Sequence, residues 1–225
     1  MANFKDIKGL TLKWEGGLSR ATTDTSSRNP SPCIHNGVSG WHTNRGITYS
    51  TFVDGSKKYG FANTCENFIN MPDAIWDKIA KGSFWDNLNL DNLKSNGVAF
   101  QIFSWHWGAG YGWFTRMQNY LSQKGIQWDK KPLSLATALN KLIDKQGEKQ
   151  TIDDLTEQQK QFYTSLNQPV YTKGWINRIE DTTKFAYSYI GKVISNNKTN
   201  FALIGVALIG SSLFAYWYYK NKYKR

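Results

Sequence analysis

The sequence contains few cysteines, few histidines and few acidic side chains for its length of 225 residues. Its two cysteines, Cys33 and Cys65, allow one disulfide in an oxidising compartment or two free thiols. Together with His35 and His42 they do not reproduce the ligand spacing of a zinc site, so we expect neither a metal nor another cofactor. Only 17 Asp and Glu stand against 28 Lys and Arg, and the formal net charge of +11 favours an anionic partner.

Other absences narrow the class of protein further. No apolar stretch follows Met1, so we expect no secretory signal peptide. Residues 1–200 contain no nucleic-acid-reading motif and no dense Lys/Arg stripe, so nucleic acid is not an expected partner. No run of alternating polar and apolar residues predicts a well-formed strand. The fold is therefore predicted to be mostly α, with a small β element around residues 46–53.

One long uncharged run lies near the C-terminal end. As a helix, residues 201–219 would extend over roughly 28 Å, which is enough to cross the hydrocarbon core of a bilayer. A polar hinge at 195–200 precedes the run, and aromatic residues and a basic tail at 220–225 follow, as is typical of a transmembrane helix in a lipid membrane. Small residues at every fourth position predict a face for self-association: Ala207, Ser211 and Ala215.

Helical periodicity recurs along the rest of the chain. Apolar residues at helical spacing predict a first helix over residues 3–15, stopped by Gly16 and Gly17. Glu15 then lies on the last turn, where its side chain can point into a cleft. A loop is predicted over 18–45. Further helices are predicted at 72–82, 97–107, 113–122, 134–147, 156–166 and 171–194, with 97–107 buried and the last interrupted at Gly174.

Three short motifs occur in order along the chain. They are Glu15-Gly-Gly17, Thr43-Asn-Arg-Gly-Ile-Thr48 and Lys173-Gly-Trp-Ile-Asn-Arg178. Together they resemble the glycoside hydrolase family 108 lysozymes, which are muramidases of the phage endolysin or secretion-activator type. That family joins an EGG-containing catalytic part to a C-terminal peptidoglycan-binding part. The resemblance implies a lysozyme-like helical domain at 1–125 and a helical, peptidoglycan-binding part at 126–194, followed by the hinge, the span and the tail.

The resemblance also implies the residues of the catalytic site. The glutamate of the EGG motif is the family's catalytic acid and corresponds to Glu15. Asp24 lies at the offset of the family's aspartate, although Thr25-Ser26-Ser27 replaces the Pro-Gly-Gly that should follow it, and Asp54 is an alternative. Glycoside hydrolysis needs an acid for the leaving oxygen and a second group to activate water. We assign the acid to Glu15 and the second role to Asp24 or to a water held by Thr48.

Aromatic residues make up 15% of the chain, which suits a carbohydrate site as well as a dense core. Five residues near the motifs are predicted to bind substrate: Trp41, Asn44, Trp105, Trp107 and Tyr111. Trp41 and Trp107 are the strongest aromatic candidates because they lie beside motifs or glycine-rich turns. Trp175 of the third motif allows two interpretations. It either contributes to a surface for the glycan or peptide stem, or locks the C-terminal helix onto the catalytic helices.

The sequence therefore predicts a membrane-anchored, phage-encoded muramidase that cleaves the MurNAc–GlcNAc backbone of bacterial peptidoglycan. Its expected location is a virion membrane or the host cell envelope. A lytic transglycosylase on the same scaffold is one alternative, and a non-catalytic, peptidoglycan-binding virion or envelope protein is another. The sequence leaves a retaining or inverting outcome open.

Overall fold

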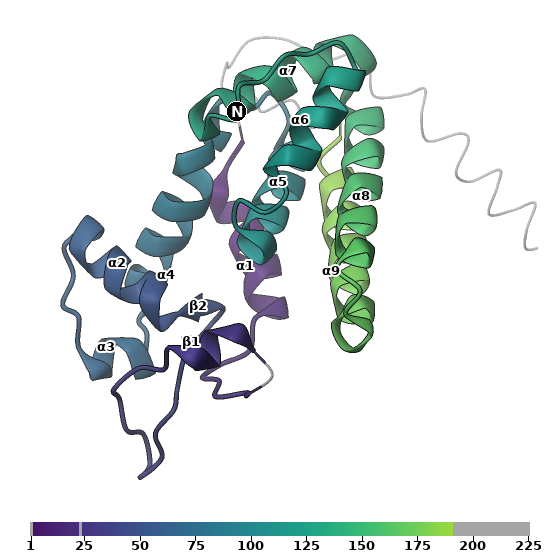
Figure 1. Ribbon diagram of the computed structural model, residues 1–225. Helices are drawn as coiled ribbons and strands as arrows, with labels where there is room; N and C mark the ends of the chain where they lie inside the picture. The colour runs from purple at the N-terminus through teal and green to yellow at the C-terminus, as the bar shows by residue number, and fades with distance from the viewer. Residues whose placement is uncertain (1, 23, 191–225) are drawn as a thin grey trace, which may run out of the picture. The chain divides into compact units, whose positions relative to one another are not determined.

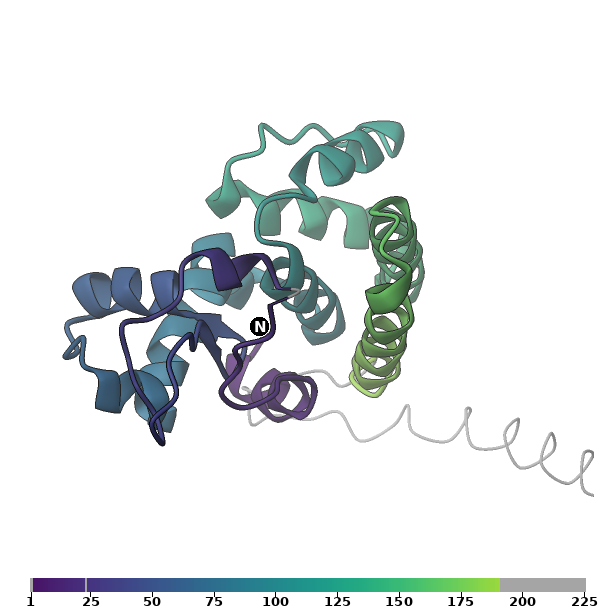
Figure 2. The same ribbon diagram turned by 60° about the horizontal axis from the view of Figure 1, so that its bottom comes forward.

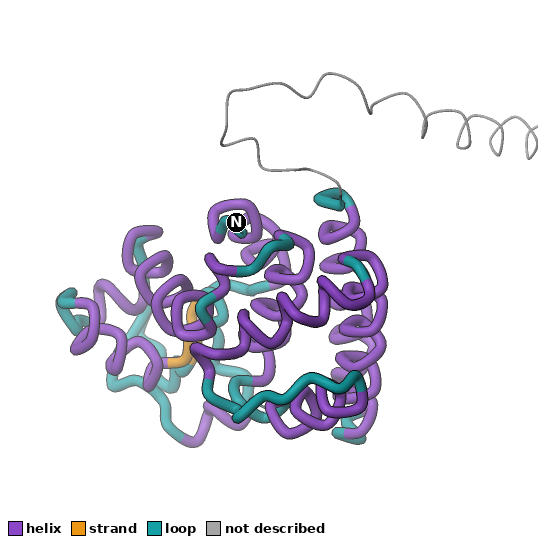
Figure 3. Tube along the Cα trace, turned by 90° about the horizontal axis from the view of Figure 1, so that it is seen from above, coloured by secondary structure: helices purple, strands orange, loops and turns teal. Residues whose placement is uncertain are grey.

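The computed structural model describes residues 2–22 and 24–190. This part of the chain contains nine α-helices and one short β-hairpin, joined by loops and short turns (Figure 1). The helices are α1 (Phe4–Trp14), α2 (Tyr49–Tyr59), α3 (Cys65–Ile69), α4 (Asp73–Ala80), α5 (Asn96–Ala109), α6 (Phe114–Gln123), α7 (Leu135–Gln146), α8 (Glu148–Ser165) and α9 (Pro169–Tyr187). The strands are β1 (Thr43–Asn44) and β2 (Ile47–Thr48), and a 3-10 turn, η1 (Thr25–Arg28), lies in the loop after α1. Figure 3 shows how little of this part is strand.

Helix α5 lies at the centre of the core. Every residue from Asn96 to His106 is buried, because the sequence carries apolar side chains on most faces of this helix. The hairpin and α2–α4 lie to one side of it, and α8 and α9 lie side by side on the other (Figures 1 and 2). Trp105 stacks on Trp113 with ring centroids 4.8 Å apart. The buried helix predicted at 97–107 is confirmed.

A buried polar network joins α5 to α8 and α9. Gln101 on α5 donates to the Thr183 hydroxyl on α9 at 2.8 Å and accepts from the Gln159 amide on α8 at 2.5 Å. The Thr183 hydroxyl also meets the Thr156 hydroxyl at 2.9 Å. Buried polar groups that find partners fix a single packing arrangement. This network therefore sets the position of α9, the helix that carries the third motif.

The second motif forms the hairpin. Strands β1 and β2 are antiparallel, with Thr43 opposite Thr48 and Asn44 opposite Ile47. The two turn residues both have positive φ, +50° at Arg45 and +77° at Gly46, as a type I′ turn requires. The small β element predicted at 46–53 is therefore shorter than expected, because the chain becomes helix α2 directly after β2.

Two helix predictions need correction. Helix α8 begins at Glu148 instead of 156, and the Thr156 hydroxyl donates to the Ile152 carbonyl inside the helix instead of capping it. Helix α9 runs from Pro169 to Tyr187 without interruption at Gly174. Packing against α5 accounts for the earlier start of α8, because Ile152 lies against Gly97. Gly174 is exposed, and a single glycine, which costs about 1 kcal/mol in a helix, does not interrupt α9.

The predicted fold class also needs correction. Among residues 2–22 and 24–190, no helix is both long enough and apolar enough to cross a membrane. The described part is thus mostly helical without the transmembrane helix that the fold prediction included. The span predicted at 201–219, its hinge, its basic tail and its small-residue face lie outside the described residues.

Cys33 and Cys65 form a disulfide, with Cα atoms 5.3 Å apart. It joins the loop that precedes β1 to the first residue of α3, and it resolves the two alternatives that the sequence left open. Both thiols are used, so the two cysteines cannot serve as zinc ligands in this state.

Reduction of this disulfide is expected to lower the free energy of unfolding by about 2–4 kcal/mol, because the bond closes a loop of 32 positions in the unfolded chain. Denaturant unfolding with and without a reducing agent measures the effect. A double Cys33→Ala, Cys65→Ala variant is the control and should not respond to the reducing agent. Equal unfolding midpoints for the oxidised and reduced wild-type protein would contradict the prediction.

Candidate active site

Glu15 lies directly at the end of helix α1. Asn3 caps the start of this helix by accepting a hydrogen bond from the Lys5 amide at 3.0 Å. At the other end Glu15 has an extended backbone, with φ −93° and ψ 126°, while its N–H still donates to the Thr11 carbonyl at 3.2 Å. The helix therefore ends where expected, but Glu15 itself leaves the helical conformation, and neither following glycine has a positive φ.

Two donors converge on one oxygen of Glu15. The Trp107 indole Nε1 donates to Oε1 at 2.7 Å from α5, and Arg178 Nη1 donates to the same atom at 2.7 Å from α9. The side chains of Glu15 and Arg178 are only 14% and 18% exposed, so water screens this ion pair weakly. The other oxygen, Oε2, accepts no hydrogen bond from the described residues.

The second motif supplies the surface against which Glu15 rests. A Cβ atom at Gly46 would lie 2.4 Å from Glu15 Oε2, and the φ of +77° there already disfavours any other residue. The turn is held from behind, because the Trp76 indole donates to the Arg45 carbonyl at 3.0 Å and the Arg45 guanidinium pairs with Asp73 at 2.7 Å. Gly46 thus allows an approach to the carboxylate that only glycine permits.

Tyr163 completes the surroundings of the pair from α8. Its side chain is buried, and burial raises the pKa of the phenol to about 12, with the Arg178 charge opposing the rise and the Glu15 charge adding to it. The phenol is therefore neutral at physiological pH. A Cβ atom at Gly108 would lie only 2.5 Å from the Tyr163 hydroxyl oxygen. A glycine thus makes room on this side as well.

Asp24 belongs to a polar cluster beside β1. Its Oδ1 accepts hydrogen bonds from the amide and the hydroxyl of Ser26 at 2.9 and 2.6 Å, and so caps η1. Partial burial works to raise the pKa of Asp24, but the bonds from Ser26 and the neighbouring His42 outweigh it and hold the pKa below its usual value. The Ser26 hydroxyl also lies 3.0 Å from His42 Nδ1 and 3.2 Å from the Thr43 hydroxyl. Asp24 is thereby connected to the first residue of the second motif.

Thr48 and Asn44, also in the second motif, make structural contacts. The Thr48 hydroxyl caps α2 by accepting from the Thr51 amide at 3.2 Å. The buried Asn44 amide donates to the Phe68 and Ile69 carbonyls at 2.7 and 2.9 Å and so fixes the hairpin to the end of α3. Their predicted catalytic and binding roles stay predictions.

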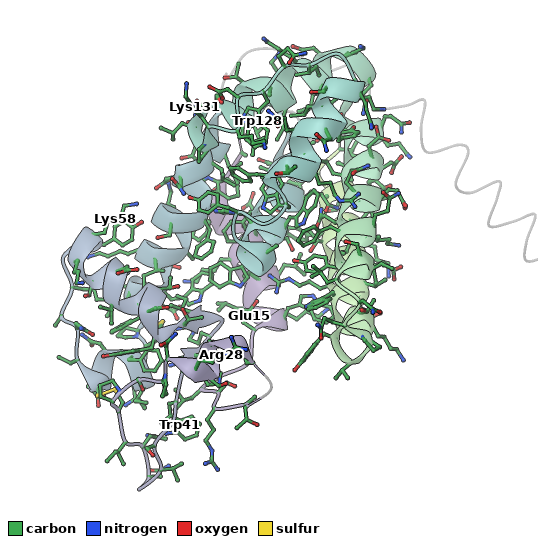
Figure 4. All side chains as sticks on the ribbon, viewed as in Figure 1. Glu15, Arg28, Trp41, Lys58, Trp128 and Lys131 are labelled. Atoms are coloured by element: carbon green, nitrogen blue, oxygen red, sulfur yellow. A yellow bond between two sulfur atoms is a disulfide. The ribbon has the colours of Figure 1, made fainter. Side chains whose placement is uncertain are left out.

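The four predicted aromatic binding residues lie in different surroundings. Trp107 contacts Glu15 directly. Trp105 is fully buried against Trp113, whereas Tyr111 is 53% exposed and accepts a hydrogen bond from Asn87. Trp41 is half-buried on the long loop, with its indole donating to a carbonyl of the same loop at 2.8 Å, and it lies apart from Glu15 in Figure 4.

Arg178 and Gly46 are contacts of Glu15 that the sequence analysis did not assign to the site. Both stand inside motifs that had been singled out, so the motifs themselves were the available signal. Arg178 lies 163 positions from Glu15 along the chain. No local pattern connects two residues at that separation.

A solved structure, that of Brucella abortus SagA, has the same fold, with a TM-score of 0.60 and 19% sequence identity over 83% of this chain and 94% of that one. No curated protein sequence is significantly similar to the chain.

The family assignment rests on the sequence of the site-bearing segment. Residues 9–110 match the family model described as Glycosyl hydrolase 108. This segment contains Glu15 and the hairpin, and the match confirms the resemblance that the motifs indicate. Residues 9–110 are thus similar to a family of glycoside hydrolases.

Proposed function

We propose that the protein is a muramidase that cleaves the MurNAc–GlcNAc backbone of peptidoglycan, with Glu15 as the general acid. One observation carries the proposal: all three motifs meet at one carboxylate. The first motif contributes Glu15 itself, the second contributes Gly46 against Oε2, and the third contributes Arg178 on Oε1. The type I′ turn already favours a glycine at position 46, and the close approach of Glu15 Oε2 is a second reason for it.

The contacts support a division of work between the two oxygens of Glu15. Oε1 takes the hydrogen bonds of Trp107 and Arg178, which fix the carboxyl plane. Oε2 remains for the proton that must reach the leaving oxygen of the glycosidic bond.

The substrate class is supported by charge as well as by family. The chain carries a net charge of +11, and the carboxylates of the peptide stems make the bacterial wall anionic. Opposite charge raises the local concentration of enzyme on such a polymer. The proposal is tested by turbidity of a purified wall suspension, which falls if the glycan is cut and stays constant if the protein only binds.

The second catalytic group is tested separately. Asp24→Asn is expected to reduce activity about 10²-fold if the carboxylate activates water, and Thr48→Ala is expected to reduce it if its hydroxyl holds that water. The effects are measured as rates of wall cleavage for each variant. The melting temperature is the control, because Asp24 caps η1 and Thr48 caps α2. Asp54→Asn removes the alternative carboxylate and is expected to leave the rate unchanged.

A lytic transglycosylase is the second candidate function, and one observation favours it. Both hydrogen bonds to the Asp24 carboxylate come from Ser26, and the bond from the Ser26 amide caps η1, whereas the Glu15 carboxylate has no capping role. A transglycosylase needs one such group because the sugar's own hydroxyl closes the ring. Mass spectrometry of the products distinguishes the hydrolase from the transglycosylase. Products with 1,6-anhydromuramic ends, together with full activity of the Asp24→Asn variant, would identify the protein as a transglycosylase.

A further inference from the structure

The segment that follows Glu15 runs along the hairpin. The Ser19 amide donates to the Thr43 carbonyl at 2.7 Å, and the His42 amide donates to the Ser19 carbonyl at 3.0 Å, so the two stretches form an antiparallel bridge. Asp24 follows a few residues later, where the chain enters η1. The hairpin that contacts Glu15 therefore also holds the polar cluster around Asp24.

His42 lies inside this cluster and is fully buried. Its Nε2 is 3.2 Å from the Ala21 carbonyl, and because a carbonyl only accepts, we place a proton on Nε2. Its Nδ1 is 2.9 Å from the Thr43 hydroxyl and 3.0 Å from the Ser26 hydroxyl. A neutral Nδ1 needs one donated proton, and the Thr43 hydroxyl can supply it.

The Ser26 hydroxyl has one proton and lies within hydrogen-bond distance of Asp24, His42 and Thr43. Asp24 Oδ1 is the closest partner, at 2.6 Å, and a carboxylate accepts more strongly than a neutral oxygen or nitrogen. Because Thr43 serves Nδ1 of His42, the Ser26 proton is left for Asp24. A protonated His42 gives the same result, since Nδ1 then donates to the Ser26 oxygen.

These bonds hold one oxygen of Asp24 and leave the other open. Oδ1 accepts from both the amide and the hydroxyl of Ser26, whereas Oδ2 accepts no hydrogen bond from the described residues. Asp24 is exposed, so water reaches Oδ2. A carboxylate that activates water must be ionised and must keep a fixed direction. Donation by Ser26 serves both needs, because a hydrogen bond to the charged form favours that form.

We propose that Ser26 and His42 are positioning residues that orient the Asp24 carboxylate so that Oδ2 holds the attacking water. The inference rests on the proposed function in its hydrolase form and specifies what places the second catalytic group. Ser26 belongs to the Thr25-Ser26-Ser27 stretch that stands where the family has Pro-Gly-Gly. A network of side chains thus takes the place of a glycine turn in this chain.

The first test compares two serines of the same turn. Ser26→Ala keeps the amide that caps η1 but loses the hydroxyl, and is expected to lower the maximal rate of wall cleavage about 10-fold. Ser27→Ala is the matched control, because the Ser27 hydroxyl donates to the backbone carbonyls of Thr22 and Asp24 and not to the carboxylate. It should keep the wild-type rate.

His42→Gln removes the ring nitrogen beside Ser26 and is expected to lower the rate in the same direction. Its melting temperature shows whether the buried position tolerates the change. If melting falls, Ser26→Ala decides the matter by itself.

The second test asks whether Ser26 acts through Asp24. In a protein that already carries Asp24→Asn, adding Ser26→Ala should cost no further activity, whereas a merely structural role would give additive losses. NMR titration of the full-length protein should also show the pKa of the Asp24 carboxyl group rising in Ser26→Ala and staying unchanged in Ser27→Ala. Additive losses, equal rates for the two serine variants, or an unmoved Asp24 titration would each overturn the inference.

Failure of the proposed function gives a different pattern. Wild-type protein that leaves the wall suspension turbid removes the enzyme, and the role of both positioning residues falls with it. Cleavage by wild type together with full activity of Asp24→Asn keeps a glycan-cleaving enzyme and overturns the positioning alone. Cleavage by wild type with equal rates for Ser26→Ala and Ser27→Ala does the same.

Discussion

Replacing Glu15 with glutamine is expected to abolish wall cleavage, with a rate about 10²–10⁴-fold below wild type. The amide has nearly the shape of the carboxyl group, but it cannot donate an acidic proton to the leaving oxygen. Its carbonyl oxygen can still accept the hydrogen bonds that Trp107 and Arg178 make to Oε1. Helix α1 and the hairpin should therefore keep their positions, which circular dichroism and melting would show while turbidity records the loss.

Glu180→Gln is the matched control for this result. Glu180 lies on α9 two residues after Arg178 and pairs with Lys160 at 3.0 Å on the exposed side of the helix. The substitution removes the same charge from an ion pair without touching Glu15. We expect wild-type activity from it. Full activity in the Glu15→Gln protein would show that Glu15 is not the acid.

Gly46→Ala is expected to reduce wall cleavage at least about 10²-fold, the order of loss that follows from misplacing a catalytic group by one ångström. The added Cβ would stand 2.4 Å from Glu15 Oε2, so the carboxylate must move away from its present position. The φ of +77° adds a cost of about 1–3 kcal/mol in stability. Rates of cleavage and the free energy of unfolding, measured on the same preparation, give both effects.

Backbone strain and displacement of Glu15 can be told apart with Gly60→Ala. Gly60 ends α2 with φ +67°, and a Cβ atom there meets nothing within 4 Å. This variant carries the same kind of strain and should lose similar stability while it keeps its activity. If Gly46→Ala were no less active than Gly60→Ala, the contact between Gly46 and Glu15 would have no catalytic importance.

Local spacing was sufficient to predict most helices of the described part and the place of Glu15 at the end of the first one. Hydrophobic periodicity and local composition depend on residues that are close in the sequence. A helix such as α5, which is apolar on most faces, can therefore be recognised from its own residues. The order of the three motifs was likewise enough to indicate the family that residues 9–110 match. The predicted start of α8 was wrong because packing on α5 outweighs a local signal, and the predicted interruption of α9 was wrong because one glycine is too weak to break a helix.

The tertiary structure alone decided what surrounds the carboxylate. Arg178 reaches Glu15 from 163 positions away, Cys33 pairs with Cys65, and Thr48 caps a helix while the Thr43 hydroxyl joins the Asp24 cluster. Contacts of this kind depend on how helices dock against one another. That docking is set by the summed burial of many side chains and by networks such as Gln101 with Thr183. No segment contains this information by itself, because each contact joins residues whose neighbours in the sequence are unrelated.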